Sequence, residues 1–497
     1  MGFNIQIGRF RISAGVAPAY EGASTARRNK GVSVPSTSGT QAVIANGQEA
    51  RDRARHLARN NPWASNAVEA WASNMVGKGI DPRSTIENRD LRERIHDLWS
   101  EWTEVADADG VLSFAGLQNC VARNVVGSGE VFSRLRPRRD RRLPVPLQIQ
   151  LLEADQVPFH VTQQIGSNRV VAGIETNAIG RRVRYHMYRA HPSDPLGMRD
   201  GRIVQVPASQ VLHVYLPDRP GQMRGATWFA SVLQKLLDVD VYDDAEVMRK
   251  KTAALWSIFI ARAADEGAAP ALSGDQEMIA TTGDTGEAEA GIEPGTVNVL
   301  EDGEEPHFGQ PADVGGNYEA FMRSQLQSIA VGVRGLTYEL LTGDHSKSNF
   351  TAGRMGLIEF RRRALGFQDQ LINHQFNRRV WRAFLEQAVL SGRLQLKNSE
   401  DFEQIVRSVK WVGHGFEHVQ PREDSEAMVR RIRAGTSSRS EEASQMGRDP
   451  ESLEREIAAD NKRADELDLV FDSDPRRVAR SGTYQETGTT EQEQGNG

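Results

Sequence analysis

The sequence of 497 residues predicts an α+β fold in which helices predominate. Two stretches with apolar residues at helical spacing flank a polar loop at 335–354. Short runs of alternating apolar residues, separated by prolines and glycines, lie between 147 and 215 and predict β-strands. Short helices with capping signals at their starts follow Trp411.

The 335–354 loop joins two predicted helices, each with one apolar face. Before the loop, the apolar positions are Tyr318, Phe321, Met322, Leu326, Ile329 and Val333; after it they are Leu357, Phe360, Ala364, Phe367 and Leu371, continuing to Trp381, Phe384 and Leu385. The loop itself is rich in Gly, Ser, Thr and Asn. It contains no nucleophile–base pair, no metal-ligand spacing and no phosphate-binding glycine pattern, which favours contact with a partner over catalysis.

The N-terminal third begins with a segment, 1–49, that lacks sustained periodicity and is expected to be a flexible arm. Asn61 and Pro62 then provide an N-cap and a proline at the first helical position. A second helix is expected over about 90–105. The predicted strands are 147–152, 170–174, 183–188 and 211–215.

A helix of about 30 residues is predicted from Ala226, longer than the usual ~11 residues and suited to a structural strut. An acidic segment, 263–293, nearly lacks large apolar side chains and is expected to be an exposed excursion. A strand follows at 296–300. The C-terminal helices are expected over 424–432, 438–446 and 450–467, and a disordered tail over 471–497.

Cysteine content and hydropathy exclude two kinds of structure. The single cysteine, Cys120, excludes an internal disulfide and a cysteine-ligated zinc site, and we interpret it as a small apolar residue in a helix. The longest apolar run, 253–264, contains Ser257 and Arg262 and is far short of the ~20 residues that span a bilayer. We therefore expect no membrane association and no secretory signal.

One motif offers an alternative function. His414, Glu417 and His418 form H-x-x-E-H, the inverted zinc-peptidase pattern. Such a site needs both histidines on one face of a helix. Gly413 and Gly415 each lower helix stability by about 1 kcal/mol relative to alanine, which disfavours that helix. A metal-dependent hydrolase remains the alternative from a different class.

Glycine motifs give no support for nucleotide chemistry. Gly127 and Gly129 form a lone G-x-G, interpreted as a backbone turn before a strand. The sequence contains neither a Walker phosphate loop nor a G-x-S-x-G motif, so this chain is not an ATP-driven motor.

Two arginine clusters are candidate contact sites. The densest comprises Arg134, Arg136, Arg138, Arg139, Arg141 and Arg142. It could contact an acidic partner or phosphate, or it could be a solvated hairpin tip, since Pro137, Asp140 and Pro144 mark a turn.

The second cluster, Arg361, Arg362 and Arg363, spans about 200° of a helix, so the three cannot all face one ligand. We expect at least one to pair with an acid across a subunit boundary. A solvated helix face is the alternative.

Several collinear segments resemble the lambda-type portal proteins of tailed bacteriophages. They are 60–80 (NNPWASNAVEAWASNMVGKGI), 219–254 (RPGQMRGATWFASVLQKLLDVDVYDDAEVMRKKTAA), 294–300 (PGTVNVL), the 335–354 loop and 411–427 (WVGHGFEHVQPREDSEA). The resemblance covers roughly 50 to 470. This chain departs from the family where Gln420 replaces an Asp before Pro421, and the 263–293 excursion has little counterpart.

The resemblance implies a portal fold that assembles as a ring. After the arm, a wing would occupy 50–225, a first stem helix 226–256 and a clip 257–313. The span 314–390 would hold a second stem helix (to about 334), the tunnel loop and a long helix. A helical crown region would cover 391–470.

The resemblance also implies a structural rather than an enzymatic function, with no cofactor and no metal. A ring, expected to be a dodecamer, would occupy one vertex of the virion capsid and assemble in the host cytoplasm. It would nucleate procapsid assembly with the major capsid and scaffolding proteins and dock the terminase large subunit. It would conduct double-stranded DNA and hold the head–tail completion proteins. A helical scaffold or adaptor without a channel is a further alternative.

By resemblance, the 335–354 loop lines the narrowest part of the channel. The candidate contact residues are Tyr338, His345, Ser346, Lys347 and Asn349. Lys347 and His345 could touch phosphate transiently, while the small polar residues allow close approach. An ordinary surface loop between antiparallel helices is the alternative interpretation.

Net charge is compatible with a DNA channel. The chain has 61 basic and 67 acidic residues, a formal net charge of −6. Proteins that hold nucleic acid by neutralising phosphates usually show a basic excess. A ring of such chains would instead repel DNA and leave few strongly attractive sites along its wall.

Overall fold

The computed structural model describes residues 36–195, 201–255, 318–397, 401–416, 420–471, 474 and 476. It also describes the backbone of six short strands outside these ranges: β1 (Phe3–Ile7), β2 (Phe10–Ala14), β12 (Phe259–Ala261), β13 (Ala280–Thr282), β14 (Ala288–Ala290) and β15 (Asn298–Leu300). Apart from these strands and the first residues of 471–497, the predicted clip, acidic excursion and tail lie outside the described residues.

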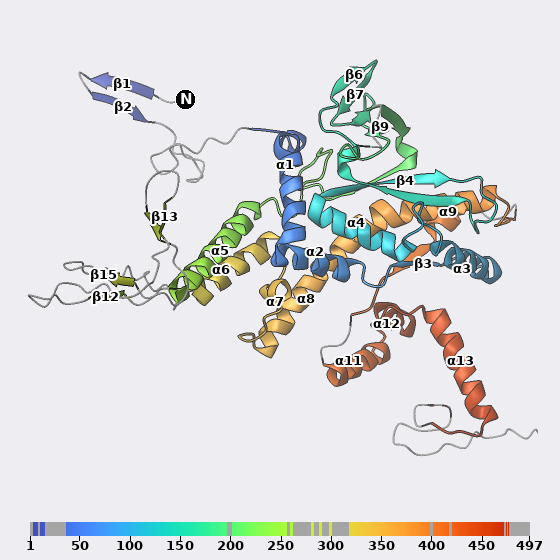
Figure 1. Cartoon of the computed structure of the whole chain (residues 1–497). Coiled ribbons are helices and arrows are strands. Elements are labelled where there is room, and N and C mark those ends of the chain that lie inside the picture. The colour runs from blue at the N-terminus through green and yellow to red at the C-terminus, as the bar shows by residue number, and fades with distance from the viewer. Residues whose placement is uncertain are drawn as a thin grey trace, which may run out of the picture.

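Helices dominate the described chain (Figure 1). In the N-terminal half they are α1 (Gly39–Asn60), α2 (Pro62–Met75), α3 (Arg89–Thr103), α4 (Phe114–Ser128) and α5 (Leu233–Leu255). In the C-terminal half they are α6 (Tyr318–Gly332), α7 (Tyr338–Thr342), α8 (Phe350–Phe367), the π-helix η6 (Gln368–Asn377), α9 (Arg378–Leu390), α10 (Phe402–Arg407), α11 (Pro421–Arg433), α12 (Arg439–Gln445) and α13 (Pro450–Glu466).

The strands of the body form three sheets. A three-stranded antiparallel sheet has the order β11 (Val211–Tyr215), β4 (Glu130–Pro137), β5 (Leu147–Leu152). A five-stranded antiparallel sheet has the order β10 (Ile203–Pro207), β9 (Arg182–Tyr188), β8 (Ile174–Thr176), β7 (Asn168–Val171), β6 (Gln163–Ile165). Two 3-10 turns, η3 (Ala154–Gln156) and η4 (Ala208–Gln210), lie beside the strands. β16 (Val409–Val412) pairs with β3 (Asp81–Ser84). The predicted mixed α+β class, mostly helical, is confirmed.

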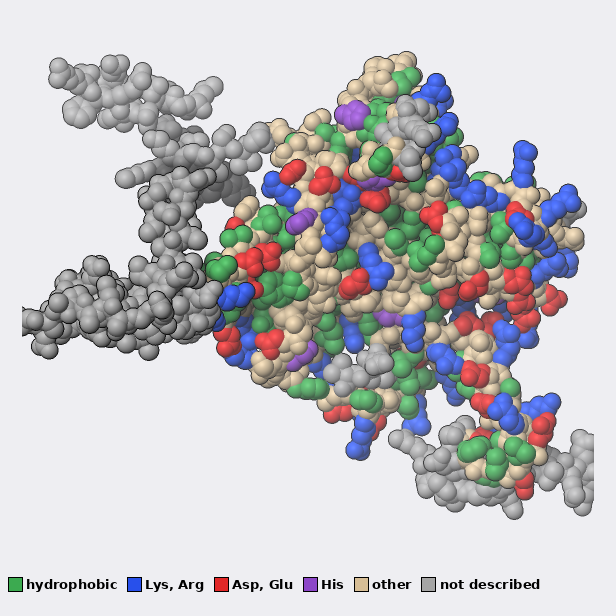
Figure 2. All heavy atoms as spheres, viewed as in Figure 1, with side chains coloured by type: hydrophobic (Ala, Val, Ile, Leu, Met, Phe, Trp, Pro, Cys, Tyr) green, Lys and Arg blue, Asp and Glu red, His purple; other side chains and the backbone are tan. Residues whose placement is uncertain are grey.

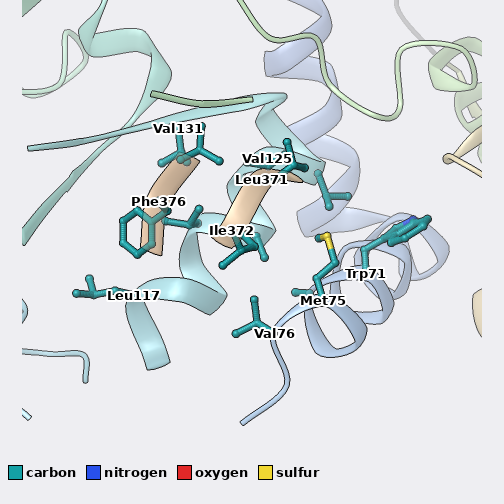
Figure 3. Packing of buried hydrophobic residues seen from close by; sticks show 14 of the residues in the cluster. Trp71, Met75, Val76, Leu117, Val125, Val131, Leu371, Ile372 and Phe376 are labelled. Atoms are coloured by element: carbon teal, nitrogen blue, oxygen red, sulfur yellow. The ribbon is translucent and has the colours of Figure 1, made fainter. Parts of the chain in front are cut away.

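The central core lies where α2, α4, β4 and η6 meet. Met75 and Val76 lie on the side of apolar residues of α4 and η6, including Leu371 and Ile372, whereas the Trp71 ring lies on the other side of α2 (Figure 3). All five are almost completely buried. Burying one side chain of this size stabilises the folded state by about 1.5–3 kcal/mol. These contacts therefore hold α2, α4 and η6 together.

A buried ionic cluster joins the core to the β-sheets. Glu130, at the start of β4, accepts hydrogen bonds from Arg224 (Nη2–Oε1, 2.5 Å), Arg51 (Nη2–Oε1, 2.7 Å), His213 (Nε2–Oε2, 3.0 Å) and the Gly225 amide (2.9 Å). The four side chains are at most 5% exposed. Buried charges persist only when paired and hydrogen-bonded, and this carboxylate is both.

Protonation in this cluster follows from the contacts. Burial alone would raise the pKa of Glu130, but the charges of Arg224 and Arg51 and the hydrogen bond from His213 hold it well below its usual range. Burial lowers the pKa of His213 to about 3, so the imidazole is neutral and donates from Nε2. The cluster therefore carries two cations and one anion.

Two glycines let the chain segments around this cluster approach closely. Gly129 ends α4 with a φ of 87°, and a Cβ there would lie 2.2 Å from the carbonyl carbon of Ala226. A Cβ on Gly225 would lie 2.1 Å from the Gly129 oxygen. Only glycine fits at either position. The interpretation of Gly127-Ser-Gly129 as a turn before a strand is confirmed at Gly129.

Several predicted element boundaries are confirmed. The strands at 147–152 and 211–215 have the predicted bounds. Asn61, Ser438 and Asp449 each accept a hydrogen bond from a backbone amide in the first turn of the following helix. The predicted strand at 170–174 is instead split into β7 and β8 by a turn at Ala172 and Gly173, both with positive φ.

Two predictions about long segments are wrong. The arm was expected to reach residue 49, but α1 begins at Gly39. Its buried positions include Arg51, a residue that periodicity analysis counts as polar. The helix expected from Ala226 begins at Leu233, because the preceding residues form turns that bury Trp228 and Phe229 against α4.

The start of α11 compensates for the missing family Asp. Gln420 gives no side-chain cap. Asp424 Oδ2 instead accepts from the Gln420 amide (3.1 Å), and its Oδ1 accepts from Arg354 of α8 (2.8 Å). The carboxylate that accepts from the backbone amide at the N-cap of α11 therefore belongs to the helix itself. The same carboxylate connects α11 to α8.

We predict that Arg224→Met lowers the free energy of unfolding by about 3 kcal/mol or more, because it leaves the buried Glu130 carboxylate short of a cation. Urea unfolding followed by tryptophan fluorescence measures this. Arg219→Met is the matched control, since Arg219 is exposed and its guanidinium donates to the exposed Thr37 carbonyl rather than to a buried carboxylate. Equal losses in the two variants would contradict the assigned role.

Candidate functional site

The helix–loop–helix unit α6–α7–α8 is the candidate site. We call residues 333–349, between α6 and α8, the hook. The predicted loop at 335–354 is shorter than expected, because α7 occupies Tyr338–Thr342 and α8 already begins at Phe350. The long helix expected to run to about residue 390 is continuous but changes to a π-helix at η6.

α2 positions the hook. Trp71 Nε1 donates to the Val333 carbonyl (3.1 Å) at the end of α6. Its ring lies edge-on to Trp228 (centroids 5.1 Å apart) and 4.7 Å from Phe360 of α8. Asn66, one and a half turns earlier in α2, donates to the carbonyls of Leu340 and Leu341 (2.8 and 2.9 Å). Side chains of α2 therefore donate to backbone carbonyls at the start of the hook, at Val333, and at the end of α7, at Leu340 and Leu341.

Left-handed residues reverse the chain at the end of α6. Arg334 and Gly335 have φ of 56° and 82°. A non-glycine residue in this region is strained and needs compensating contacts. Arg334 Nη2 pairs with Asp218 (2.7 Å), in the segment that leads to Arg224. The turn is thereby fixed to the same segment that enters the buried cluster.

Asp344 holds the hook against α6. It accepts from the Ser346 amide (2.9 Å) and from the Tyr338 hydroxyl (3.1 Å), and it pairs with Arg323 of α6 (3.5 Å). The Ser346 contacts, followed by the Tyr338 hydroxyl, lower the pKa of Asp344 to about 2. Sequence reasoning missed Asp344 and Arg323, although Asp followed two residues later by Ser is a recognisable Asx-turn signal.

The five predicted contact residues divide into two groups. Tyr338 and Asn349 have intramolecular roles: the Tyr338 ring lies under the Arg323 guanidinium (4.6 Å), and Asn349 caps α8 by accepting from the Ala352 amide. Lys347 pairs with Glu319 of α6. His345 and Ser346 are exposed at the tip. His345, Ser346 and Lys347 are therefore the members available to a partner.

The first arginine cluster lies on the β4–β5 hairpin, as the predicted turn implied. Arg136 donates to Gln150 (2.6 and 3.0 Å), and Arg138 donates to Gln148 (2.9 Å). Burial lowers the pKa of Arg134 and of Arg136. Within the described residues, Arg134, Arg136, Arg138 and Arg139 form no ion pair. Lys and Arg side chains gather at this end of the molecule (Figure 2).

The second cluster separates on α8. Arg361 lies over the Phe416 ring (4.6 Å), and Arg363 pairs with Glu359 (3.3 Å). Arg362 is the outermost, with a side chain that is 76% exposed and 3.5 Å from Glu359. The structure thus separates the three arginines, as the helical spacing required.

His414 of the H-x-x-E-H motif has a structural position. Its Nδ1 lies 3.2 Å from the Val76 carbonyl, and a Cβ on Gly77 would lie 2.5 Å from the ring. Burial lowers its pKa. Glu417 and His418 lie outside the described residues. His414 packs at the end of α2, and Val409–Val412, just before it, is a strand rather than the helix that such a zinc site requires.

One cluster of potential metal ligands was not foreseen. Glu153, Asp155 and His191 bring ligand atoms within 4.8 Å of one another. Arg55 already pairs with Glu153 (3.0 Å) and Asp155 (2.6 Å), and Arg51 lies 3.8 Å from Asp155. Two guanidinium groups thus neutralise this acidic cluster.

We predict that Asp344→Ala increases deuterium exchange of the amides at 343–349, because the Ser346 amide and Arg323 lose their shared partner. Hydrogen-exchange mass spectrometry on the full chain measures this. His345→Ala is the control, since its side chain is exposed beside the same contacts. Unchanged exchange in the Asp344 variant would show that other contacts hold the hook.

Comparison with known proteins identifies the family. The model of the lambda family of phage portal proteins matches residues 25–368. A probable portal protein of Halomonas phage phiHAP-1 is 25% identical, with 84% of this chain and 81% of that protein covered. The portal protein of Escherichia phage N15 is 24% identical, with 87% and 89% covered. Portal protein B of Escherichia phage lambda is 22% identical, with 84% of each covered.

Among solved structures, a chain in the neck of a native gene transfer agent particle has a TM-score of 0.41 and 15% identity, with 84% of this chain and 100% of that chain covered. A chain in the neck of the empty particle has a TM-score of 0.40 and 16% identity, with 82% of this chain and 94% of that chain covered.

In the described part of the chain, every helix is too short or too polar to cross a membrane. Its match to the family model over 25–368 shows that this chain belongs to the lambda family of phage portal proteins.

Proposed function

We propose that copies of this chain form a ring at one capsid vertex of a tailed phage. The ring nucleates procapsid assembly, docks the terminase large subunit, conducts double-stranded DNA and holds the head–tail completion proteins. The observation that carries this proposal is the family match over 25–368, together with relatives that align along more than four-fifths of their length. The role is structural; the protein is a virion component that assembles in the host cytoplasm.

The described elements suit the proposed regions. The wing at 50–225 would contain α2 to α4 and the two larger sheets. The stem would contain α5 and α6, which lie side by side and project from the body (Figure 1). Tyr242 of α5 stacks on Tyr318 of α6, with centroids 6.0 Å apart. A Cβ on Gly332 would lie 2.2 Å from a Val232 methyl, so the pair packs closely at its base.

The hook is the proposed channel loop. Its tip presents His345, Ser346 and Lys347, and Lys347 is paired with Glu319. An ion pair at the tip reduces the net positive charge that DNA phosphates would meet. A wall that held each phosphate firmly would stall DNA, whereas weak and exchangeable contacts permit sliding. The geometry supports guidance of the duplex rather than its capture.

The β4–β5 hairpin is the proposed contact for an acidic partner. Arg134 and Arg136 share one face of β4, since side chains alternate along a strand. Within the described residues, the Arg136 guanidinium donates to the side-chain amide oxygen of Gln150. Arg134 Nε is buried and has no hydrogen-bond acceptor there. Carboxylates of a neighbouring subunit or capsid protein would satisfy them.

We predict that the purified full chain forms closed rings. Negative-stain microscopy should show end views with a central hole that admits a B-form duplex, and mass photometry should give about twelve chains per particle. A monomer or dimer across several salt concentrations would contradict the ring and favour a helical scaffold without a channel. Stoichiometric zinc lost in His418→Ala would instead favour the hydrolase.

We predict that a photo-crosslinking amino acid at position 345 joins the protein to DNA in filled particles. The physical reason is the exposure of this side chain at the tip of the hook. Position 179, which is 86% exposed on the five-stranded sheet side of the wing, is the matched control and should give no DNA adduct. Equal crosslinking at both positions, or none at 345, would contradict the channel assignment.

A further inference from the structure

α8 carries an apolar stripe that its own chain leaves uncovered. Met355 is 68% exposed, and Ile358 and Leu365 are each nearly half exposed. Phe360 and Ala364 of the same helix are completely buried. At 100° per residue, the exposed stripe lies on the opposite side of the helix from the buried pair. One face of α8 therefore packs inward, and the other presents apolar side chains to solvent.

The exposed face of α8 is bordered by positive charge. The helix contains four arginines and one acid, Glu359. Arg362 lies between the apolar positions, at i+4 from Ile358 and i−3 from Leu365, and its side chain is 76% exposed. A partner for this face needs apolar side chains and carboxylates in the same stripe.

α5 presents such a face. Val241 is 69% exposed and Met248 is 62% exposed, seven residues apart and thus on one side of the helix. Sequence periodicity alone would place both in a core. The span 238–246 contains five acids and no base. Hydrophobic and acidic side chains lie together over α5 and α6, with basic side chains beside them (Figure 2).

Asp244 is the acid best placed to reach a neighbour. Asp240 accepts from Asn61 (3.1 Å), Asp243 accepts from Tyr318, and Glu246 pairs with Arg249 (2.6 Å). Asp244 is exposed and forms no hydrogen bond or ion pair within the described residues. It lies between Val241 and Met248 on the same stripe, three and four residues from them.

We propose that the exposed face of α8 in one copy packs on the exposed face of α5 in the next copy, with Arg362 paired to the neighbour's Asp244. The occupant of each face is a second copy of this chain, because the two faces are complementary in charge and both are apolar at their centres. The proposal rests on the ring described under Proposed function and names the surfaces that build it.

The charge pattern also sets the symmetry of the contact. Two α8 faces brought together would oppose arginine to arginine, and two α5 faces would oppose carboxylate to carboxylate. Like charges across an interface cost several kcal/mol. The favoured contact is therefore heterologous, and a heterologous contact that closes produces a ring rather than a two-fold dimer.

Charge reversal tests the pairing in the full chain. Arg362→Glu alone and Asp244→Arg alone should each reduce the fraction of protein in rings by roughly tenfold or more, as measured by mass photometry. Arg422→Glu is the matched control: it also lies on a helix, 92% exposed and 3.5 Å from a glutamate of its own helix, Glu426. Circular dichroism melting should show that all three variants remain folded.

Mixing the two single variants gives the decisive result. In a ring where the two variants alternate, the α8 face with Glu at 362 meets the α5 face with Arg at 244. The unchanged Arg362 of the other variant meets an unchanged Asp244. Equimolar mixing should therefore restore rings. Folded single variants that assemble like the wild type would overturn the proposed surfaces while leaving the portal ring intact. Failure of the mixture to recover would do the same. A wild-type chain that never assembles would overturn both the ring and this contact.

Discussion

The position of the Glu130 carboxylate is the constraint on which the remaining architecture depends. It is buried at the start of β4 and is reached by α1 through Arg51, by β11 through His213, and by the segment before α5 through Arg224. An uncompensated charge there would be costly, so these elements must all be in place together. The resemblance block that begins at Arg219 has a physical explanation in this cluster, since it supplies both Arg224 and the Gly225 amide.

Aromatic side chains connect this cluster to the hook. The chain after Gly225 inserts Trp228 against Trp71, and Trp71 in turn holds the Val333 carbonyl and the Phe360 ring. Arg334 returns to Asp218, just before the cluster. The N-terminal end of the hook and the α8 helix that follows it are therefore both held by the same body residues. The channel role proposed for the hook would benefit from such support, because within the described residues the contacts of its tip are local ones at Asp344 and Lys347.

Local signals in the sequence were sufficient for elements whose stability is local. Asn61, Ser438 and Asp449 cap helices because a short polar side chain reaches the amide two or three residues ahead. Alternation located β5 and β11 at their observed bounds. α1 escaped prediction because its inward positions include Arg51, whose partner Glu130 is 79 residues away. The late start of α5 likewise reflects a distant contact, the burial of Trp228 against α4.

The sequence by itself determined the mixed, mostly helical class, the helix–loop–helix with its polar tip, and the resemblance to portal proteins, since periodicity, caps and collinear blocks are properties of the chain in order. Only the tertiary structure decided which polar side chains contact their own chain and which apolar side chains remain exposed. Tyr338 and Asn349 serve the hook itself, whereas Val241, Met248, Met355 and Ile358 remain exposed. Periodicity reports that a helix has an apolar face; whether the same chain covers that face depends on neighbours brought together by folding.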